Sequence, residues 1–477
     1  MEKKKLPSLL AGPALFFIFL ILRPFGLDYA ASCTLGTIAW MLVWWISEAL
    51  PMGATSLLPI IIFPLTGIMS IEKTCIAYGN KFVFLFLGGF IIAIAMEKWQ
   101  LHRRIALNIV NKTGTGANNI IFGFLLSSFL ISMWISNTAT TLMMFPIATS
   151  IVAILIKKEN NHLSKGEKNF SLTLMLSIAY GSSIGGIATL VGSPPNAAAA
   201  GILSSDSFNA PISFFDWFKI GFPFALALML LTYFFLVKII YPNRLGKFEE
   251  GTSIIHEELK KLGKPTTAEL RVFVVFVATA ILWILADPIS TLLKPYGVEL
   301  SDVVVSMIAA VALFIIPSSA ADKKPLLDWK DTERLPWGVL LMFGGGLAMA
   351  EAFKNSGLIE QVTSLMKIFE SGNMFVFVSI LCFTGIILTA LMSNLAMVNI
   401  FVPVVAALAL GAGIHPAIFA IPVAISSSCD FMFPMSTPPN AIAYSSGYVK
   451  ASQMLKSGIV INLVSFILLM IVVALTL

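Results

Sequence analysis

The chain has 477 residues, of which 57% are hydrophobic and 12% are charged, and its mean hydropathy is +0.90. A soluble protein of this size could not keep so many apolar side chains out of water, so the composition indicates a polytopic membrane protein. The formal net charge of +6 gives no reason to expect a nucleic-acid partner, because the basic residues lie in short loops, where they orient membrane helices.

The N-terminal apolar stretch follows three lysines, Lys3 to Lys5, but no small-residue cleavage site comes after it. We therefore expect a first helix that is retained. The basic loops all fall on one side of a consistent threading, and the positive-inside rule makes that side the cytoplasm. This predicts a multi-pass protein of the cytoplasmic (inner) membrane, with the lipid bilayer around it and the N-terminus in the cytoplasm.

The apolar runs are long and continuous, which predicts helices and disfavours an outer-membrane barrel. A basic amphipathic stretch at 97–112 is expected along the inner interface. The segment 118–156 has basic residues at both ends, so it must enter and leave on one side, as a re-entrant hairpin with its tip at 136–138. The other expected helices lie near 9–22, 32–49, 55–69, 82–96, 171–203 with a break at 192–196, 218–240, 272–285, 303–316, 337–353, 374–410 as a second hairpin, 418–447 with a break, and 458–475.

Short motifs occur twice. The polar run at 136–141 has a second copy at 393–396, and each copy is followed by Pro-Pro-Asn, at 194–196 and at 438–440. Matching helices start on opposite sides of the threading, so the repeats are inverted, a plan typical of secondary transporters. The expected fold is thus an all-α polytopic membrane protein, an inverted-repeat transporter fold with about 11 transmembrane helices and two re-entrant helical hairpins.

The repeat predicts a division of the chain into four parts, with a polar linker between two halves. They are an N-terminal helix at 1–30, a first inverted repeat at 31–240, a cytoplasmic linker at 241–269 and a second inverted repeat at 270–477. Each repeat would contain scaffold helices (31–112 and 270–353), a hairpin (118–156 and 374–410), a broken helix (171–203 and 418–447) and a final helix (218–240 and 458–477).

The broken elements are the candidate binding sites, because irregular backbone persists in a membrane only where it is buried in protein or lines a cavity. Asn137 and Asn394 each offer an amide oxygen for a cation and an NH2 group for a carboxylate. Pro194 and Pro438, with the prolines that follow them, are expected to stop the helix and leave preceding carbonyls free. No Lys or Arg lies in the motifs, so co-bound cations and N–H dipoles would have to neutralise a bound dianion.

These paired motifs, together with Trp-Trp-Ile-Ser-Glu-Ala-Leu-Pro at 44–51, resemble the divalent anion:sodium symporter (DASS) family, which carries C4 dicarboxylates, citrate or sulfate. The resemblance covers nearly the whole chain. It implies symport of a di- or tricarboxylate with Na+ as the coupling ion, no other cofactor, and no enzymatic activity. It also implies a homodimer whose protomers contain scaffold and transport domains and move the site by an elevator mechanism.

The resemblance also carries site residues over to this chain by motif. The first sodium site would use Ser132, Ser136, Asn137 and Gly192, and the second would use Thr389, Met392 through its backbone, Asn394 and Ser436. The substrate carboxylates would meet Asn137, Thr138, Ser193, Pro194, Asn394, Thr437 and Pro438.

Four residues depart from the family pattern. Leu395 replaces a hydroxyl residue of some members, which removes one substrate contact, and Ser193 and Ser436 stand where threonine and alanine are expected. Asp430 replaces a small apolar residue. An intramembrane acid is a functional candidate by default, so Asp430 is a candidate coupling residue; the alternative is a silent role at the interface or beside a serine.

Other functions remain open at this point. A Na+-independent dicarboxylate exchanger of the same fold fits the same motifs, and a sulfate transporter fits them less well. A membrane-embedded enzyme would need a nucleophile with a base, or a pair of carboxylates, at one depth; Asp430 has no histidine or acid near it in the sequence. A channel is a poor fit, because two re-entrant tips would close the site from both sides.

Overall fold

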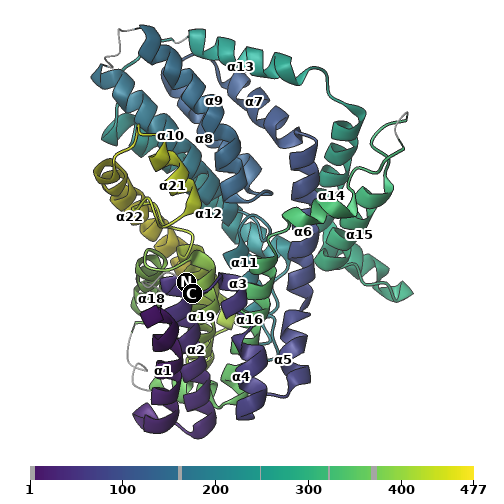
Figure 1. The fold of residues 1–477 in the computed structure, drawn as a ribbon, viewed down its shortest axis with the longest axis vertical. Coiled ribbons are helices and arrows are strands. Elements are labelled where there is room, and N and C mark those ends of the chain that lie inside the picture. The colour runs from purple at the N-terminus through teal and green to yellow at the C-terminus, as the bar shows by residue number, and fades with distance from the viewer. Residues whose placement is uncertain (1–5, 159–163, 248, 321–322, 367–372) are drawn as a thin grey trace.

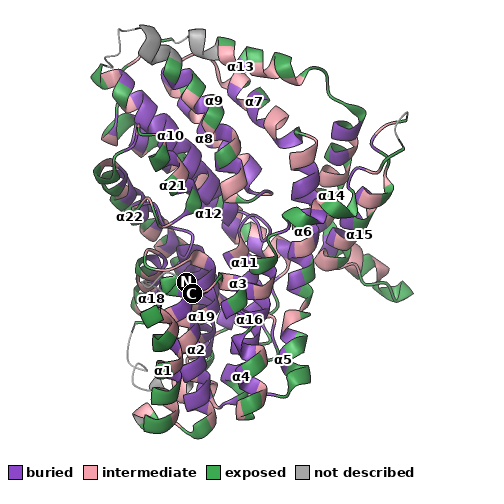
Figure 2. Cartoon of the chain, in the orientation of Figure 1, coloured by how far each residue is buried: buried purple, intermediate pink, exposed green. Residues whose placement is uncertain are grey.

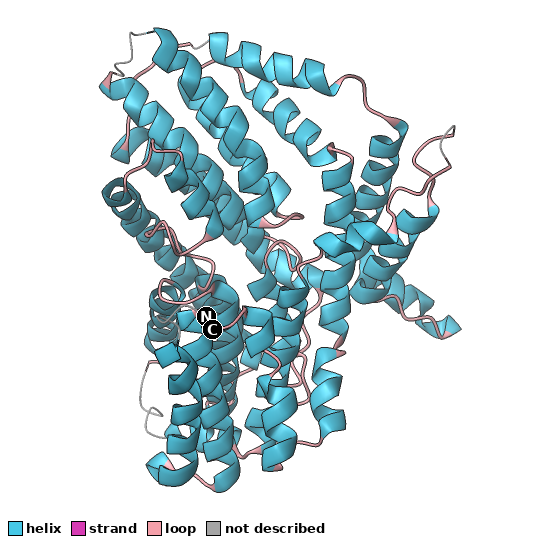
Figure 3. Cartoon of the chain, viewed as in Figure 1, coloured by secondary structure: helices cyan, strands magenta, loops and turns pink. Residues whose placement is uncertain are grey.

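The computed structural model describes residues 6–158, 164–247, 249–320, 323–366 and 373–477. Every regular element in these ranges is helical, and none is a strand (Figure 3). Seven helical stretches of the described chain are long and apolar enough to cross a membrane, so this is a multi-pass membrane protein. They are Tyr29–Ser47, Ile71–Lys98, Lys165–Ile187, Phe214–Ile240, Thr267–Tyr296, Asn394–Gly411 and Ala451–Thr476.

The α-helices follow one another through short connections. Up to the middle of the chain they are α1 (Leu6–Leu22), α2 (Tyr29–Ser47), α3 (Met52–Thr55), α4 (Leu58–Thr66), α5 (Ile71–Tyr78), α6 (Lys81–Lys98), α7 (Leu101–Thr113), α8 (Ala117–Ser132), α9 (Asn137–Lys158), α10 (Lys165–Ile187), α11 (Pro194–Leu203) and α12 (Phe214–Phe234). They continue with α13 (Glu249–Leu262), α14 (Thr267–Leu293), α15 (Asp302–Ile315), α16 (Trp337–Asn355), α17 (Leu358–Met366), α18 (Met374–Thr389), α19 (Asn394–Gly411), α20 (Pro416–Ser426), α21 (Pro438–Ser445) and α22 (Ala451–Thr476). Short 3-10 or π segments are η1 (Pro24–Gly26), η2 (Phe235–Ile240), η3 (Lys294–Tyr296) and η4 (Trp329–Arg334).

Two helical hairpins, α8–α9 and α18–α19, occur as predicted, and each is followed by a helix that is interrupted before a Pro-Pro-Asn sequence. In Figure 1 the first hairpin lies in the upper part of the molecule and the second in the lower part. The arms α8 and α18 have 16 residues each, a rise of about 24 Å, which is less than the ~30 Å of hydrocarbon in a bilayer. Neither arm is therefore long enough to cross a membrane.

Some boundaries differ from those predicted. The helix expected at 55–69 is shorter: it is α4, which spans Leu58–Thr66 with Pro59 in its first turn, and the separate short helix α3 precedes it. The helix expected at 272–285 is longer, since α14 continues through Pro288. The segment 241–269 contains α13, a helix that the sequence analysis did not predict. The division of the chain at residues 30, 240 and 269 stays a prediction.

Helix α10 lies at the centre of the first half and is buried along almost its whole length (Figure 2). It packs against α8, α9, α12 and α21. Glycines allow this close packing: a Cβ at Gly181 would lie 2.7 Å from the Leu125 carbonyl oxygen, and one at Gly185 would overlap the Phe129 carbonyl. Backbones that approach so closely are a known way to associate helices in membranes.

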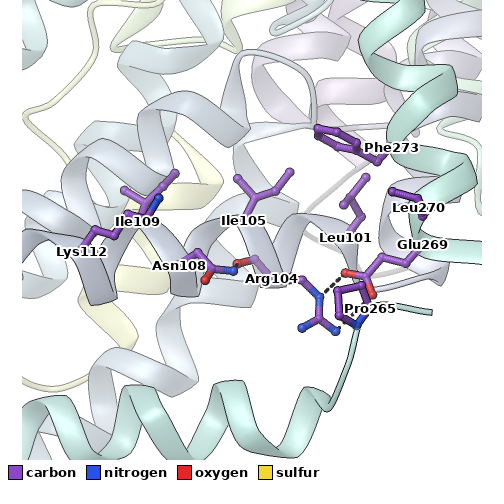
Figure 4. Close-up of a pocket in the computed structure, with 10 residues that line it drawn as sticks. All are labelled: Leu101, Arg104, Ile105, Asn108, Ile109, Lys112, Pro265, Glu269, Leu270 and Phe273. Atoms are coloured by element: carbon purple, nitrogen blue, oxygen red, sulfur yellow. Dashed lines mark hydrogen bonds and ion pairs between the residues drawn. The ribbon is translucent and has the colours of Figure 1, made fainter. Parts of the chain in front are cut away.

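Helix α7 is joined to both α13 and α14 by ion pairs. Arg103 pairs with Glu258 of α13, and the hydrogen bond from Lys261 lowers the pKa of Glu258, which keeps its carboxylate ionised. Arg104 pairs with Glu269 at the start of α14 and donates to the Gly263 carbonyl at 2.9 Å (Figure 4). The linker is thus fixed to α7.

Beside this ion pair is a cavity of about 350 Å³ between α7 and α14. Figure 4 shows its walls, which are mostly apolar side chains such as Ile105 and Phe273. It lies away from the Pro-Pro-Asn sequences, so it plays no part in the candidate site.

Replacement of Arg104 tests this attachment. Glu269 is only 4% exposed, so Arg104→Ala leaves a buried carboxylate without its partner and should lower the free energy of unfolding by about 2–3 kcal/mol. Thermal unfolding of the purified protein measures the change. Lys112→Ala, at an exposed position of the same helix, is the control and should stay within about 0.5 kcal/mol. Equal shifts for the two variants would contradict the assigned role.

Candidate functional site

Both hairpin tips are built in the same way. Ser136 is the last residue of the turn between α8 and α9. Its hydroxyl accepts a hydrogen bond from the Ala139 N–H at 3.3 Å and so caps α9. Ser393 caps α19 in the same manner, with the Ala396 N–H as donor at 3.3 Å. The two serines therefore begin the second arm of each hairpin, and the asparagine that follows each is the first residue of that arm.

In each tip a hydroxyl five residues earlier donates to the amide oxygen of that asparagine. Ser132 Oγ lies 2.7 Å from Asn137 Oδ1, and Thr389 Oγ1 lies 2.8 Å from Asn394 Oδ1. Thr389 Oγ1 also lies 2.6 Å from the Ser427 carbonyl oxygen. The hydrogen bonds orient both carboxamides and place two neutral oxygens side by side at each tip.

The asparagine of each Pro-Pro-Asn sequence bridges the interruption in its broken helix. In the first half, Asn196 Nδ2 donates to the carbonyls of Gly186 at 2.8 Å and Thr189 at 2.7 Å. In the second half, Asn440 Nδ2 donates to the carbonyls of Asp430 and Phe433, each at 3.2 Å. The acceptors lie ten and seven residues before the asparagine in both halves, so the two loops share one architecture.

The prolines act differently from the expectation that they stop a helix. Pro194 and Pro438 each begin the next helix, α11 and α21, where a missing N–H removes no intrahelical bond. The carbonyls freed before them are bound in part by the asparagine amides. Ser193 and Thr437 occupy the N-cap positions, and the Thr437 hydroxyl accepts from the Asn440 N–H at 3.4 Å.

Two glycines bring the first loop against the first tip. A Cβ at Gly186 would overlap the Asn137 amide, and a Cβ at Gly192 would lie 3.0 Å from the Met133 carbonyl oxygen. Thr189 Oγ1 also donates to the Met133 carbonyl, at 2.5 Å. The loop and the tip are therefore in direct contact through neutral oxygen atoms.

The broken helices cross between the two halves. Helix α11, which follows the first loop, packs against α19 of the second hairpin, and α21, which follows the second loop, packs against α9 of the first. Each half thus supplies a helix to the hairpin of the other. The tips and loops carry no Lys or Arg at 132–141, 186–196, 389–396 or 427–440, so helix N-termini are the positive ends available there.

The structure brings several predicted site residues together. Ser132, Asn137 and Gly192 are joined through Gly186 and Met133, and Thr389 is bonded to Asn394. Ser136 is a capping residue and is exposed. The remaining predicted residues are placed as follows: Thr138 in the first turn of α9, Met392 in the turn after α18, Pro194 and Pro438 at the starts of α11 and α21, and Ser193, Ser436 and Thr437 in the loops before those helices.

Ser436 does not join the Thr389–Asn394 pair through a hydrogen bond. Its hydroxyl donates to the Phe433 carbonyl at 2.7 Å and lies 3.4 Å from Asn440 Nδ2. Leu395 is buried, which agrees with packing in place of a polar contact.

Three polar residues of the site were missed by sequence reasoning: Thr189, Asn196 and Asn440. The asparagines belong to a motif that was recognised, but their role was not predicted. The sequence did contain a signal, because Pro-Pro-Asn occurs in both halves and the asparagine is repeated together with the prolines.

Removal of the bridging amide should destabilise the fold. Asn196 is fully buried, so Asn196→Ala leaves several carbonyls without a donor and should lower the free energy of unfolding by about 1–3 kcal/mol. Asn108→Ala removes an exposed asparagine with one local hydrogen bond and serves as the control in the same thermal-unfolding measurement. A shift no larger than that of Asn108→Ala would show that the bridge contributes little.

The chain is similar to known membrane transporters along nearly its whole length. Residues 3–476 match the family described as the sodium:sulfate symporter transmembrane region. The chain is 36% identical to the sodium-dependent dicarboxylate transporter SdcS of Staphylococcus saprophyticus, over 98% of this chain and 91% of the relative. It is also 36% identical to SdcS of Staphylococcus aureus strain USA300, over 99% of this chain and 92% of the relative.

A solved structure shares the fold. It is the YdaH transporter from Alcanivorax borkumensis, with a TM-score of 0.52 and 11% sequence identity, over 92% of this chain and 98% of the other. The likeness concerns the fold alone. With a family match along almost the entire sequence, the chain belongs to the sodium:sulfate symporter family of membrane transporters, and it is a transporter and not an enzyme.

Proposed function

We propose that this protein is a secondary transporter that couples Na+ to the uptake of a C4 dicarboxylate such as succinate. The observation that carries the proposal is the doubled hydroxyl–asparagine pair, Ser132–Asn137 and Thr389–Asn394, each at the tip of a hairpin. The similarity of this chain to two relatives that are named sodium-dependent dicarboxylate transporters supports the same substrate class.

The first cation would bind at the contact between tip and loop. Asn137 Oδ1 and Ser132 Oγ are adjacent, the Gly186 backbone lies beside the Asn137 amide, and Gly192 lies against Gly186 and the Met133 carbonyl. Hard neutral oxygens are thus gathered without a competing charge. The second cation would use Thr389, Asn394 and the Met392 carbonyl at the corresponding tip, with Ser436 from the loop. These assignments extend the predicted ligand sets and are part of the proposal.

The substrate would be held by donors and not by basic side chains. In each tip a hydroxyl bonds to the amide oxygen of Asn137 or Asn394, and the Nδ2 group of that asparagine is the donor that would meet a substrate carboxylate. Thr138 and Thr437 add hydroxyls, and the N-termini before Pro194 and Pro438, with Ser193, add backbone dipoles. A dianion held in this way needs co-bound cations, because an uncompensated buried charge is very costly.

The transport cycle would follow the family plan of a homodimer with an elevator motion, in the cytoplasmic membrane with the N-terminus inside. The crossing of α11 and α21 to opposite hairpins supports movement of both tips and both loops as one body. There are three alternatives: transport of a tricarboxylate such as citrate, transport of sulfate, and exchange that does not require Na+.

Substitution of Gly186 tests the proposed first sodium site. A methyl group at this position would displace the Asn137 amide, so Gly186→Ala should raise the Na+ concentration for half-maximal uptake by about tenfold or more. Gly246→Ala, where a Cβ meets nothing within 4 Å, is the matched control and should leave uptake unchanged. An unaltered Na+ dependence in Gly186→Ala would remove Asn137 from the site.

Uptake into proteoliposomes tests the function itself. Labelled succinate, citrate and sulfate are each offered with and without an inward Na+ gradient, and we expect accumulation of succinate that requires the gradient. Asn137→Ala and Asn394→Ala should abolish it. Flux that ignores Na+ but needs an internal counter-substrate would identify an exchanger, and preferred uptake of citrate or sulfate would replace the dicarboxylate in the proposal.

A further inference from the structure

The loop before the second Pro-Pro-Asn sequence carries one charged residue, whereas the loop before the first carries none. Counting back ten residues from the bridging asparagine gives Gly186 in the first loop and Asp430 in the second, and in both cases the carbonyl of that residue accepts from the asparagine amide. Asp430 is completely buried. The second half therefore carries a carboxylate where the first half has no side chain at all.

The backbone around Asp430 is unwound, unlike its counterpart. Helix α10 continues to Ile187, one residue beyond Gly186, whereas α20 ends at Ser426, well before Asp430. The residue after Asp430 is held from outside the loop: Tyr180 Oη donates to the Phe431 carbonyl at 2.9 Å, and the Phe431 N–H donates to Asn462 Oδ1 at 3.3 Å. The carboxylate is thus placed by a rigid, non-helical segment.

The Asp430 carboxylate has no hydrogen-bond partner among the described residues, and neither oxygen reaches the surface. Two further oxygens are buried and unpartnered as well: Ser428 Oγ, two residues earlier in the chain, and Oδ1 of Asn440, whose Nδ2 bonds to the Asp430 carbonyl. The Ser436 hydroxyl interacts with the carboxylate, although it donates its hydrogen bond to the Phe433 carbonyl, and it belongs to the proposed second sodium set. A group of buried oxygens that includes a carboxylate and lacks a positive partner matches the ligands of a hard cation.

The charge of the group selects the cation. The described residues contain no cluster of three or more His, Cys, Asp or Glu that could hold a metal ion. One carboxylate with neutral oxygens suits a monovalent ion, whereas Ca²⁺ sites commonly draw on several carboxylates. A buried carboxylate without a counter-ion is strongly unfavourable, and a bound Na+ removes that cost.

We propose that Asp430 is a direct Na+ ligand, so that the second half of the molecule binds a cation with a carboxylate while the first half uses neutral oxygens alone. This inference rests on the proposed Na+ coupling, and it adds a negatively charged ligand to the second sodium site. With a dianion and Asp430 both in the membrane, the loaded transporter needs more cations than the dianion alone would require.

The test is a Na+ titration of the purified transporter, with choline replacing Na+ at constant ionic strength and the melting temperature as the readout. Asp430→Asn keeps the shape but removes the charge, and it should raise the half-stabilising Na+ concentration by about tenfold or more. Asp430→Glu restores the charge and should recover part of the affinity. Asp28→Asn is the control, because Asp28 caps α2 through the Ala31 N–H and asparagine caps equally well.

The outcomes separate this inference from the proposed function. A Na+ titration of Asp430→Asn that coincides with wild type overturns the inference, and it leaves Na+ coupling intact if Asn137→Ala still weakens the response. A change in pH dependence with an unchanged Na+ titration assigns a proton to Asp430 and also overturns it. If wild type shows no Na+-specific stabilisation, both proposals fall. Asp430→Gly, which copies the residue at position 186, replaces Asp430→Asn should that variant fail to fold.

Discussion

The structure depends on how two helices can be interrupted without leaving buried carbonyls unpaired. An orphaned backbone group in hydrocarbon costs several kcal/mol, so a break survives only where another group replaces the lost bonds. Asn196 and Asn440 supply that group, each with one amide that reaches carbonyls seven and ten residues back. Because the amide closes the loop, the proline two residues before the asparagine can start a new helix. The loop also keeps a fixed shape beside the hairpin tip.

The same loops join the halves of the molecule. A helix of ten residues, α11, and one of eight, α21, rise only about 12–15 Å, so neither can leave the interior by itself. Each packs on the hairpin of the opposite half instead. A displacement of one tip is therefore transmitted to the loop that belongs to the other, which is a physical basis for binding in which cations and substrate depend on one another.

Much of this could be predicted from local sequence, and some could not. The first hairpin followed from basic residues at both ends of an apolar segment, and the second followed from the repeat of its polar motif. The placing of position 132 and Asn137 in one site followed from a family resemblance. The bridges made by Asn196 and Asn440 did not, because their acceptors lie in segments that look like ordinary helix. Helix α13 was also missed, since Arg103 and Arg104 of α7 hold it through Glu258 and the Leu262 carbonyl, more than 150 positions away. Long-range contacts of this kind leave no periodic signal.

Because the two loops share the hydrogen-bond pattern of their asparagines, the charge that only the second loop carries is informative. Gly186 lets Asn137 pack directly on α10, and a larger residue there would displace the amide. Asp430 stands at the same place in the second loop, and it is accommodated because α20 ends early and the backbone turns away from the helical path. The unwinding and the carboxylate therefore belong together, because an acid on a continued helix would collide with its tip. On this proposal the buried charge of Asp430 is balanced only when a cation is bound, which makes occupancy of that site a condition for moving through the membrane.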